Sequence, residues 1–396
     1  MRVCFVSRRY FPAISGMSVY AHNLLRELVA LGHEVTMISQ DRGDAAGTAV
    51  YGGGPPPAVP CVRVIGREAL GEQAGGDFER DVDDLIEQVL SSGPYDIVHA
   101  QYGYPTGLAA LEAARRLGLP CVVSIQGGDG HWVGSCCQTH LDAMRIVCEQ
   151  ANAVLIGCAS FRDEVVERLD VSPERFTLVP GAVDVERFTP QTHQGGQAPL
   201  MRPRLLYHGR VDRRKGILDL LEALPDEMEL VVSGIGPDLE PARAAAAGRP
   251  VRFLGQIDYD DVPAVYGEGD VFVSPTYAEG FSNTVLEAMA SGLPIVSTTA
   301  VGVVDCLRDG ENGLLVEPGD VPALAAALER ITTDAPLRDR LRATALEEVR
   351  RTYAWPQVAG QIAAEYARVA GSTPAPGWEL PRAVLPCRFR DAPHLL

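Results

Sequence analysis

The stretch VCFVSRRYFPAISGMSVYAHNLLRELVALGHEVTMIS, residues 3–39, decides the class of fold. A short apolar run at 3–7 is followed by a loop with proline and glycine, and then by helical periodicity over 18–31. Gly32 is placed to end that helix, and 34–39 is the next apolar run. Strands joined by a helix of this length pair in parallel through a crossover, so the stretch predicts an α/β layered fold.

The same alternation of strand and helix recurs along most of the chain. In the first half it predicts strands at 97–99, 121–125 and 154–157, with a helix at 108–117. In the second half it predicts strands at 205–208, 229–233, 251–254, 271–274, 294–298 and 313–316, and helices at 336–351 and 355–370. The sequence therefore predicts an α/β protein of two doubly wound, Rossmann-like domains. Because such sheets bind ligands beyond the carboxyl ends of their strands, we expect the domains to face a cleft.

Domain boundaries are predicted where the alternation breaks. The segment QTHQGGQAPLMRP, residues 191–203, is polar and aperiodic and is interpreted as an interdomain linker. We therefore predict an N-terminal domain at 1–190 and a C-terminal domain at 204–354, with one ligand on each wall of the cleft. A helix at 355–370 is expected to cross back to the first domain. The Pro-rich segment 371–396 is predicted either to be disordered or to lie along a domain surface.

Charge and cysteine content exclude several classes of function. The 396 residues carry 52 acidic and 35 basic side chains, a net charge of −17, which argues against a nucleic-acid or anionic-lipid surface. The nine cysteines show no CxxC pair and no His/Cys zinc spacing, so we expect reduced thiols and no metal ion. No apolar run approaches the ~20 residues of a membrane span. We expect a cytoplasmic protein without stable membrane insertion, and its oligomeric state is left open.

Two loops of the second domain combine the features of a diphosphate site. HGRVDRRKG at 208–216 follows a strand and is the densest basic cluster of the chain, with Arg210 and Lys215 straddling a turn. EGFSNTVLE at 279–287 leads into a helix whose N-terminal N–H groups favour an anion, and carboxylates there can accept bonds from sugar hydroxyls. The alternatives are a solvated basic turn, favoured for Arg213 and Arg214, and an ordinary capped helix.

Loops of the first domain carry weaker signals. Gly16, in YFPAISG at 10–16, would allow close approach of a phosphate. QGGDGH at 126–131 supplies Gln126, Asp129 and His131 as cleft residues, and a Gly-rich turn with a solvated aspartate is the alternative. Gln101 and His99 follow another strand, where His99 is more often a core histidine. Nearby aromatic residues either stack on a sugar or pack in the core: Tyr102, Tyr104 and Trp132.

The ordered series of motifs resembles the GT4 family of glycosyltransferases, of the retaining GT-B type, over about residues 1–370. GRVDRRKG at 209–216 resembles the family's GR-x4-KG loop, and EGFSNTVLE at 279–287 resembles its E-x7-E motif. VDVERFTP at 183–190 is similar to its VD-x2-RF-x-P motif, and RYFPAISG at 9–16 to its Gly-Gly phosphate loop. Several motifs in order are far more specific than any one of them.

The resemblance implies a role for each matching residue. Arg210 and Lys215 would bind the donor diphosphate and Glu279 the donor sugar, which makes these three the catalytic candidates. The remaining donor contacts would come from residues that meet the ribose, the base, the sugar or the phosphates: Glu287, Gln256, Ile257, Gly280, Phe281, Ser282, Asn283 and Gly16.

The sequence departs from the family pattern on the acceptor side. Ser15 precedes Gly16 where Gly-Gly is usual, and Gln101 and Gln126 stand where histidines are common. Glutamine can donate and accept hydrogen bonds but cannot carry a proton at neutral pH, so acid–base chemistry is not expected at these positions. The acceptor-side candidates are Gln101, Gln126, Asp129 and His131.

The predicted function is retaining transfer of a hexosyl group from a nucleotide sugar, expected to be UDP-linked, to an acceptor. The acceptor is expected to be a small hydrophilic metabolite, with a glycan also open. Neither a cofactor nor a metal ion is expected, because the basic loop and the helix N-terminus can replace a cation. The alternatives are an epimerase or phosphorylase on the same fold, and a catalytically silent sugar-nucleotide-binding partner.

Overall fold

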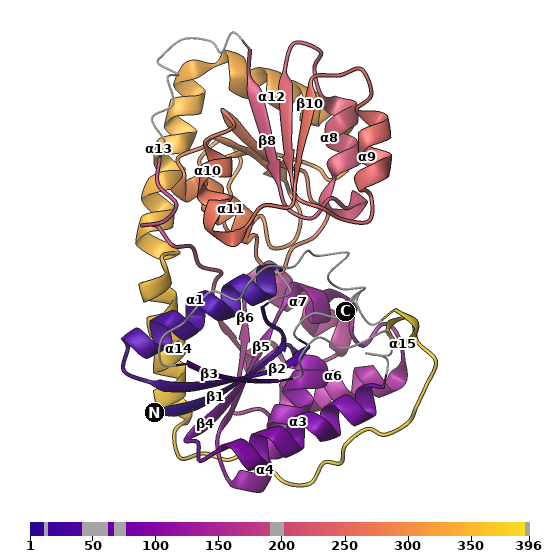
Figure 1. Ribbon diagram of the computed structural model, residues 1–396, viewed down its shortest axis with the longest axis vertical. Helices are drawn as coiled ribbons and strands as arrows, with labels where there is room; N and C mark the ends of the chain where they lie inside the picture. Colours follow the sequence, from indigo (N-terminus) through magenta and orange to yellow (C-terminus); the bar gives the residue numbers. More distant parts are fainter. Residues whose placement is uncertain (12–14, 42–61, 67–76, 191–201, 393–396) are drawn as a thin grey trace. The chain divides into compact units, whose positions relative to one another are not determined.

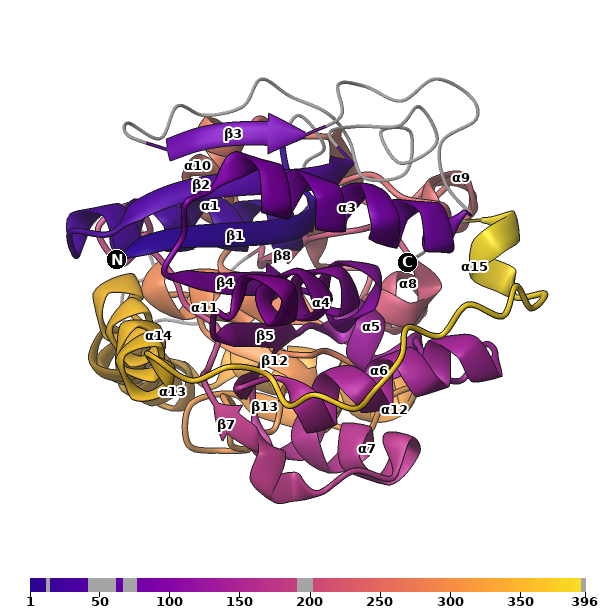
Figure 2. The same cartoon turned by 90° about the horizontal axis from the view of Figure 1, so that it is seen from below.

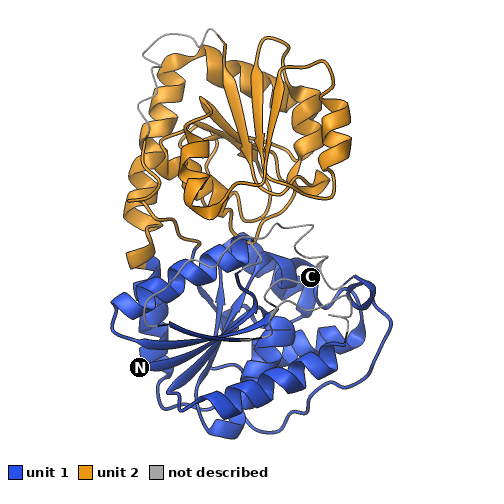
Figure 3. Cartoon of the chain, in the orientation of Figure 1, with its two compact units in different colours: residues 1–180, 358–396 blue, residues 181–357 orange. Residues whose placement is uncertain are grey.

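The computed structural model describes residues 1–11, 15–41, 62–66, 77–190 and 202–392. The chain forms two compact units: Met1–Pro180 with Val358–Leu396 is unit 1, and Gly181–Gln357 is unit 2 (Figure 3). The boundary differs from the predicted one, because residues 181–190 belong to unit 2, where Val183 and Phe188 enter an apolar core with Phe272. Helix α14 (Trp355–Val369) carries the chain back from unit 2 into unit 1. Most of the predicted linker, 191–201, lies outside the described residues.

Unit 1 is built on a seven-stranded parallel sheet of order β3-β2-β1-β4-β5-β6-β7. Its strands are β1 (Arg2–Arg9), β2 (Glu34–Asp41), β3 (Val62–Gly66), β4 (Ile97–Gln101), β5 (Cys121–Ile125), β6 (Ala153–Ile156) and β7 (Phe176–Leu178). Its helical segments are α1 (Gly16–Ala30), α3 (Phe78–Ser92), η1 (Gly103–Gly107), α4 (Leu108–Leu117), α5 (Gly127–Trp132), α6 (Gln138–Gln150), α7 (Ala159–Leu169), η2 (Pro173–Arg175) and α15 (Arg388–Asp391). Helices cover both faces of this sheet (Figures 1 and 2), which is why strands such as β1 are almost continuously buried.

Unit 2 is built on a six-stranded parallel sheet of order β10-β9-β8-β11-β12-β13. Its strands are β8 (Arg204–His208), β9 (Glu229–Ser233), β10 (Val251–Gly255), β11 (Val271–Ser274), β12 (Ile295–Thr298) and β13 (Leu314–Val316). Its helical segments are η3 (Arg213–Lys215), α8 (Ile217–Ala223), α9 (Leu239–Ala245), η4 (Tyr259–Asp261), α10 (Val262–Tyr266), α11 (Asn283–Ala290), α12 (Val321–Thr333) and α13 (Ala335–Thr352).

Two apolar cores lie on opposite faces of the unit 2 sheet. Because successive strand residues point to opposite faces, Leu205 joins one core and Leu206 the other. The first core contains residues of α8 and α12, and the second contains residues of α11 and α13, as the placement of these helices in Figure 1 shows. The sheet is therefore the middle layer of a three-layer sandwich, as the alternation of strand and helix predicts.

The helix of the opening stretch begins two residues before the predicted start and ends at the predicted glycine. Ser15, which was not predicted as a cap, caps α1, with its side chain accepting from the N–H of Ser18 at 3.2 Å. At the other end, Gly32 has a φ of +84°. Gly32 N–H donates to Val29 and His33 N–H to Leu28, at 2.9 and 3.0 Å, which closes the helix with a left-handed turn.

The C-terminal segment lies along the surface of unit 1 as far as residue 392. Of the two predicted alternatives, disorder and a course along a domain surface, the described residues therefore follow the second. Figure 2 shows it as the yellow trace that runs beside α4 and α6 to α15. Arg382 forms an ion pair with Asp83 at 2.8 Å, and Arg390 forms one with Glu79 at 2.5 Å. The hydroxyl of Thr139 also donates to the carbonyl of Ala383 at 2.6 Å.

The predicted fold class, two doubly wound α/β domains, is confirmed. Two strands were not predicted, β3 and β7, and both are edge strands with partly exposed residues, so they lack the continuous apolar run of a central strand. None of the helices in the described part of the chain has the length and hydropathy that crossing a bilayer requires.

The link between α14 and β4 gives a test of the packing of unit 1. The buried ring of His99 contacts the Tyr366 hydroxyl through Nδ1 at 2.6 Å and the Ser124 hydroxyl through Nε2 at 2.8 Å, which confirms it as a core histidine. Tyr366→Phe leaves the buried Nδ1 without this partner, so we expect a loss of about 1–3 kcal/mol in the free energy of unfolding. Urea unfolding measures this loss. Tyr277→Phe, which removes a hydrogen bond of an exposed tyrosine to Asp219, is the control and should change stability by less than about 0.5 kcal/mol.

Candidate active site

Four of the predicted site segments lie where each sheet changes the direction of its strand order. In unit 1 this switch point lies between β1 and β4, and in unit 2 it lies between β8 and β11. The loop that leads to Gly16 follows β1, Gln101 is the last residue of β4, and the two diphosphate-site loops follow β8 and β11. The switch point is where doubly wound sheets bind ligands, so the fold brings each pair of loops to its binding edge.

The basic loop after β8 is ordered by aspartates. Asp212 caps η3 by accepting from the N–H of Arg214 at 2.8 Å, and it pairs with the guanidinium of Arg210 at 2.8 Å. Arg213 pairs with Asp238 at 2.6 Å. Burial acts to raise the pKa of Asp212, but the hydrogen bond from Arg214 and the charge of Arg210 hold it below its usual value. The ion pairs of Arg213 and Arg214 support their interpretation as structural residues.

The loops after β8 and β11 are joined by backbone contacts. The N–H of Tyr277 donates to the carbonyl of Arg214 at 3.0 Å. Gly216 has a φ of +72°, and a Cβ there would lie 1.9 Å from the carbonyl oxygen of Pro275. Only glycine can occupy this position, because a side chain would collide with backbone. This close approach sets Lys215 beside the β11 loop.

The contact brings together two of the three catalytic candidates. Lys215 Nζ lies 2.7 Å from Glu279 Oε2, and the two side chains are 28% and 16% exposed. Both groups are thus held in place while remaining open to a ligand. The pair offers a cation for a phosphate and a carboxylate for sugar hydroxyls from one point on the edge of the sheet.

The N-terminus of α11 has polar atoms without partners. Ser282 is its N-cap, but its side chain makes no capping bond. Among the described residues, neither Ser282 Oγ nor Asn283 Oδ1 has a hydrogen-bond partner, and both atoms are buried. Buried polar atoms are rarely left unpaired, so these two atoms are suited to contact a polar group of a ligand. Gly280 and Phe281 precede them in the same loop.

Glu287 lies further along α11 and faces Tyr266 of α10. The Tyr266 hydroxyl donates to Glu287 Oε2 at 2.6 Å. Burial raises the pKa of Glu287 to about 7, although the hydrogen bond from Tyr266 and the charge of Arg187 act in the opposite direction. The sequence did not identify Tyr266 or Asp212 as site residues, because neither stands out in a motif until the fold shows what it contacts.

The loop with Gly16 opens α1 of unit 1. Gly16 is the first residue of the helix and is exposed, with no atom within 4 Å of where a Cβ would lie. Ser15, the departure from the usual Gly-Gly, is the N-cap. Residues 12–14 of this loop lie outside the described residues. Gln101 is fully buried: its Oε1 accepts from the hydroxyl of Ser7 at 2.9 Å and its Nε2 donates to the carbonyl of Met17 at 3.2 Å. Gln101 thus positions the start of α1.

The acceptor-side candidates on α5 differ in their exposure. Asp129 is fully buried and not solvated, and its two oxygens accept from the N–H groups of Gln126, at 2.8 Å, and Gly103. Burial raises the pKa of Asp129 to about 6, against the effect of these backbone hydrogen bonds. His131 is buried, with Nδ1 2.6 Å from Glu164 Oε1. Gln126 is partly exposed at the start of α5, so it is the member of this group that is open to a ligand.

The predicted base-binding residues follow the edge strand β10. Gln256 is exposed, and Ile257 is partly buried against the core that contains α11. β10 is the outermost strand opposite β13. Because all strands of the sheet are parallel, the segment after β10 lies at the same carboxyl-end edge as the loops after β8 and β11. Of the site residues in unit 2, the structure brings Lys215 and Glu279 into direct contact and holds Arg210 through Asp212.

Solved structures with the same architecture include glycosyltransferases. Sucrose-phosphate synthase from Thermosynechococcus elongatus aligns with a TM-score of 0.74 and 22% identity over 93% of this chain and 99% of that one. The Anabaena protein HepE, solved with UDP, aligns with a TM-score of 0.71 and 18% identity over 93% and 100%. Two doubly wound units of this kind define the GT-B class of fold.

Sequence comparisons give the family. Residues 15–182 match the model described as glycosyl transferase 4-like domain, and residues 202–334 match the model of glycosyl transferases group 1. Glycogen synthase of Mycobacterium tuberculosis is 26% identical over 92% of this chain and 94% of its own length. D-inositol 3-phosphate glycosyltransferase of Salinispora tropica is 27% identical over 86% and 78%. The chain belongs to the GT4 family of glycosyltransferases.

The raised pKa of Glu287 predicts a pH dependence of stability. The ordinary value for this carboxyl is 4.5 and the folded value is about 7, so the stability conferred by its neutral form is present below pH 4.5 and is lost as the pH rises through about 7. Glu287→Gln, which stays neutral, should therefore unfold at higher urea concentration than the wild type at pH 8 and at a similar concentration at pH 4.5. Glu240→Gln removes an exposed carboxylate and is the control. If the urea midpoints of Glu287→Gln and the wild type differed by the same amount at pH 8 and at pH 4.5, the prediction would be contradicted.

Proposed function

We propose that the enzyme transfers a sugar, with retention of anomeric configuration, from a UDP-sugar to the hydroxyl of a small hydrophilic acceptor. The proposed donor site is supported by the contact of Lys215 with Glu279, in the loop that leads to the unpaired atoms of Ser282 and Asn283. A cation, a carboxylate and a helix N-terminus then lie together at the switch point of unit 2. They match a ligand with both phosphate and sugar groups.

In the proposed reaction, the bond between the anomeric carbon and the β-phosphate oxygen breaks, and a bond from the anomeric carbon to the acceptor oxygen forms on the same face. The acceptor hydroxyl gives its proton to the leaving UDP, so the products are the glycoside and UDP. Lys215 and Arg210 would stabilise the charge that develops on the diphosphate, and Glu279 would hold the sugar. The two cations and the N-terminus of α11 would take the role of a metal ion here.

The proposal of a small hydrophilic acceptor is supported by a residue of unit 1 and by the name of one relative. Gln126 is the partly exposed polar residue at the start of α5, and it can hydrogen-bond hydroxyl groups as donor and acceptor. The Salinispora relative is named for an inositol phosphate, a small polar molecule of this kind. We also propose a cytoplasmic location, on the basis of the scattered cysteines in the sequence.

Removing either member of the contact should abolish transfer without unfolding the enzyme. Lys215→Ala and Glu279→Ala are expected to lower kcat by about 10²–10³-fold, because each removes a group that stabilises the transition state. Arg213→Ala is the matched control: it removes a cation from the same turn, but one that pairs with Asp238, and should change kcat by no more than about twofold. Release of UDP from UDP-glucose with a panel of acceptors measures the rate. Normal turnover by a folded Lys215→Ala or Glu279→Ala variant would refute the assignment.

Nucleoside diphosphates test the donor base. UDP at about 100 times its Kd should stabilise the protein by about 2.7 kcal/mol, which is a rise of several degrees in Tm, and the rise should be smaller with ADP or GDP. Lys215→Ala should lose most of the shift. A larger shift with ADP or GDP would show that the donor is not UDP-linked. Hydrolysis of UDP-glucose by the wild type without acceptor would exclude the catalytically silent alternative.

A further inference from the structure

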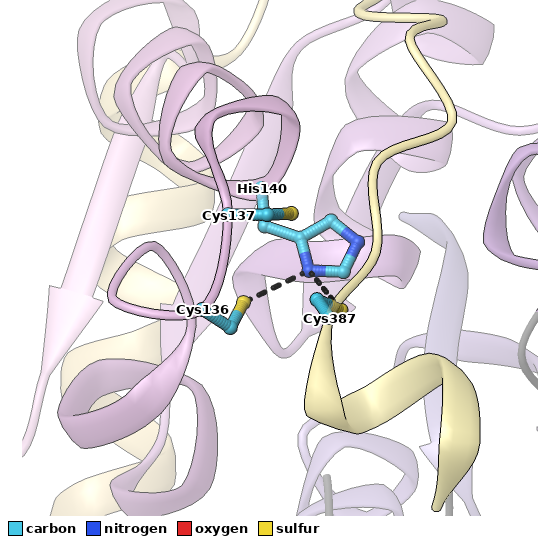
Figure 4. Close-up of side chains that lie close together, drawn as sticks. All are labelled: Cys136, Cys137, His140 and Cys387. Atoms are coloured by element: carbon cyan, nitrogen blue, oxygen red, sulfur yellow. Dashed lines mark hydrogen bonds between the residues drawn. The ribbon is translucent and has the colours of Figure 1, made fainter.

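A second cluster of reactive side chains lies in unit 1, between the start of α6 and the C-terminal segment. Cys136, Cys137, His140 and Cys387 place their sulfur and ring nitrogen atoms within 4.8 Å of one another (Figure 4). His140 Nδ1 lies 3.1 Å from Cys136 Sγ and 3.8 Å from Cys387 Sγ. We propose that these four residues bind a zinc ion, which fastens the C-terminal segment to unit 1.

The ligand set and its spacing fit zinc. Three thiolates and one imidazole form a structural zinc site, which is tetrahedral with Zn–S bonds of about 2.3 Å. Ligand atoms of such a tetrahedron lie about 3.8 Å apart, and the atoms of this cluster need only small side-chain movements to reach that spacing. Soft sulfur ligands favour zinc over magnesium or calcium, which take oxygen.

The surroundings orient the ligands. Cys137 is the N-cap of α6 and His140 is in its first turn, so their side chains lie on the same side of the helix start. The His140 ring packs on Tyr104 and Phe78, with ring centroids 4.5 and 5.1 Å away. This packing turns Nδ1 toward the sulfurs. Among the described residues Nε2 has no hydrogen-bond partner, so it can keep the proton and leave the lone pair of Nδ1 for a metal.

Backbone and charge also suit bound thiolates. Cys137 is the N-cap of α6 and Cys136 directly precedes it, so both thiols lie at a helix N-terminus, which favours negative charge. Binding one Zn²⁺ releases three thiol protons to the solvent and leaves a net charge of −1 on the site. Arg390 interacts electrostatically with Cys387 and partly balances that charge. All four ligand positions are filled by protein, which is typical of a structural and not a catalytic site.

The site joins segments that are far apart in the sequence. Cys136, Cys137 and His140 stand within five residues of the sequence, but Cys387 is 247 residues from His140, so the sequence did not show the complete ligand set and led us to expect no metal ion. Cys136 and Cys137 follow α5, which carries Gln126, and Cys387 precedes α15. Zinc would therefore tie the C-terminal segment to the end of the α5 region, in addition to the ion pair of Arg390 with Glu79.

Metal analysis of the full-length protein tests the proposal independently of glycosyl transfer. Wild type prepared under reducing conditions with zinc in the growth medium should retain about one zinc ion per chain after dialysis, and cobalt in its place should show the absorption of tetrahedral thiolate coordination. Cys387→Ser and Cys137→Ser should each lower the zinc content by at least about tenfold. Cys158→Ser is the matched control and should keep its zinc, because Cys158 is the N-cap of α7, where serine is favoured.

Proteolysis tests what the metal does. A chelator should greatly speed trypsin cleavage after Arg388 and Arg390 in the wild type, and Cys387→Ser should be cleaved quickly with or without chelator. The proposal is overturned if folded wild type holds no stoichiometric zinc, or if Cys387→Ser holds as much as wild type. It is equally overturned if the purified protein contains a disulfide among these cysteines in place of a metal. Unchanged cleavage on chelation would refute the fastening role.

Discussion

Every strand of both sheets is parallel to its neighbours, so the carboxyl ends of the strands of each sheet lie at one edge. Where the strand order reverses, neighbouring loops diverge from adjacent strands and leave room for a ligand. In unit 2 this room is bounded by a backbone contact so close that Gly216 cannot carry a side chain. The contact places Lys215 against Glu279, and the donor side of the active site is a consequence of it.

The charges of the proposed donor site have partners within the protein. Lys215 is paired with Glu279, and both side chains are partly exposed, so this pair contributes little to stability and a phosphate can displace it at small cost. Arg210 is paired with the buried carboxylate of Asp212, which holds the guanidinium in place. Arg213 and Arg214 are also paired, and they order the turn. An acidic protein with a net charge of −17 can therefore present a local cationic site, because its basic residues are positioned individually.

The sequence predicts the features that depend on local pattern. The central strands, the turn at Gly32 and the helix that follows residues 279–282 were predicted because each has a signal within a few residues. Contacts between distant residues were not: Tyr266 against Glu287, Gln101 against Ser7, and Cys387 against His140. The burial of Asp129 was also missed, because a Gly-rich turn reads as solvent-exposed until its N–H donors are located. Edge strands such as β7 are short and half-exposed, so their pattern is weak.

The route of the chain has a consequence for folding during synthesis. Unit 2 ends at Gln357, whereas unit 1 needs Val358–Leu396 to be complete. On the ribosome, the later unit in the sequence thus has its whole chain first, the reverse of the usual N-terminal-first order. Until α14 emerges, His99 in the nascent sheet lacks the hydroxyl of Tyr366. The nascent N-terminal half therefore cannot complete its core until a helix encoded after unit 2 has been synthesised.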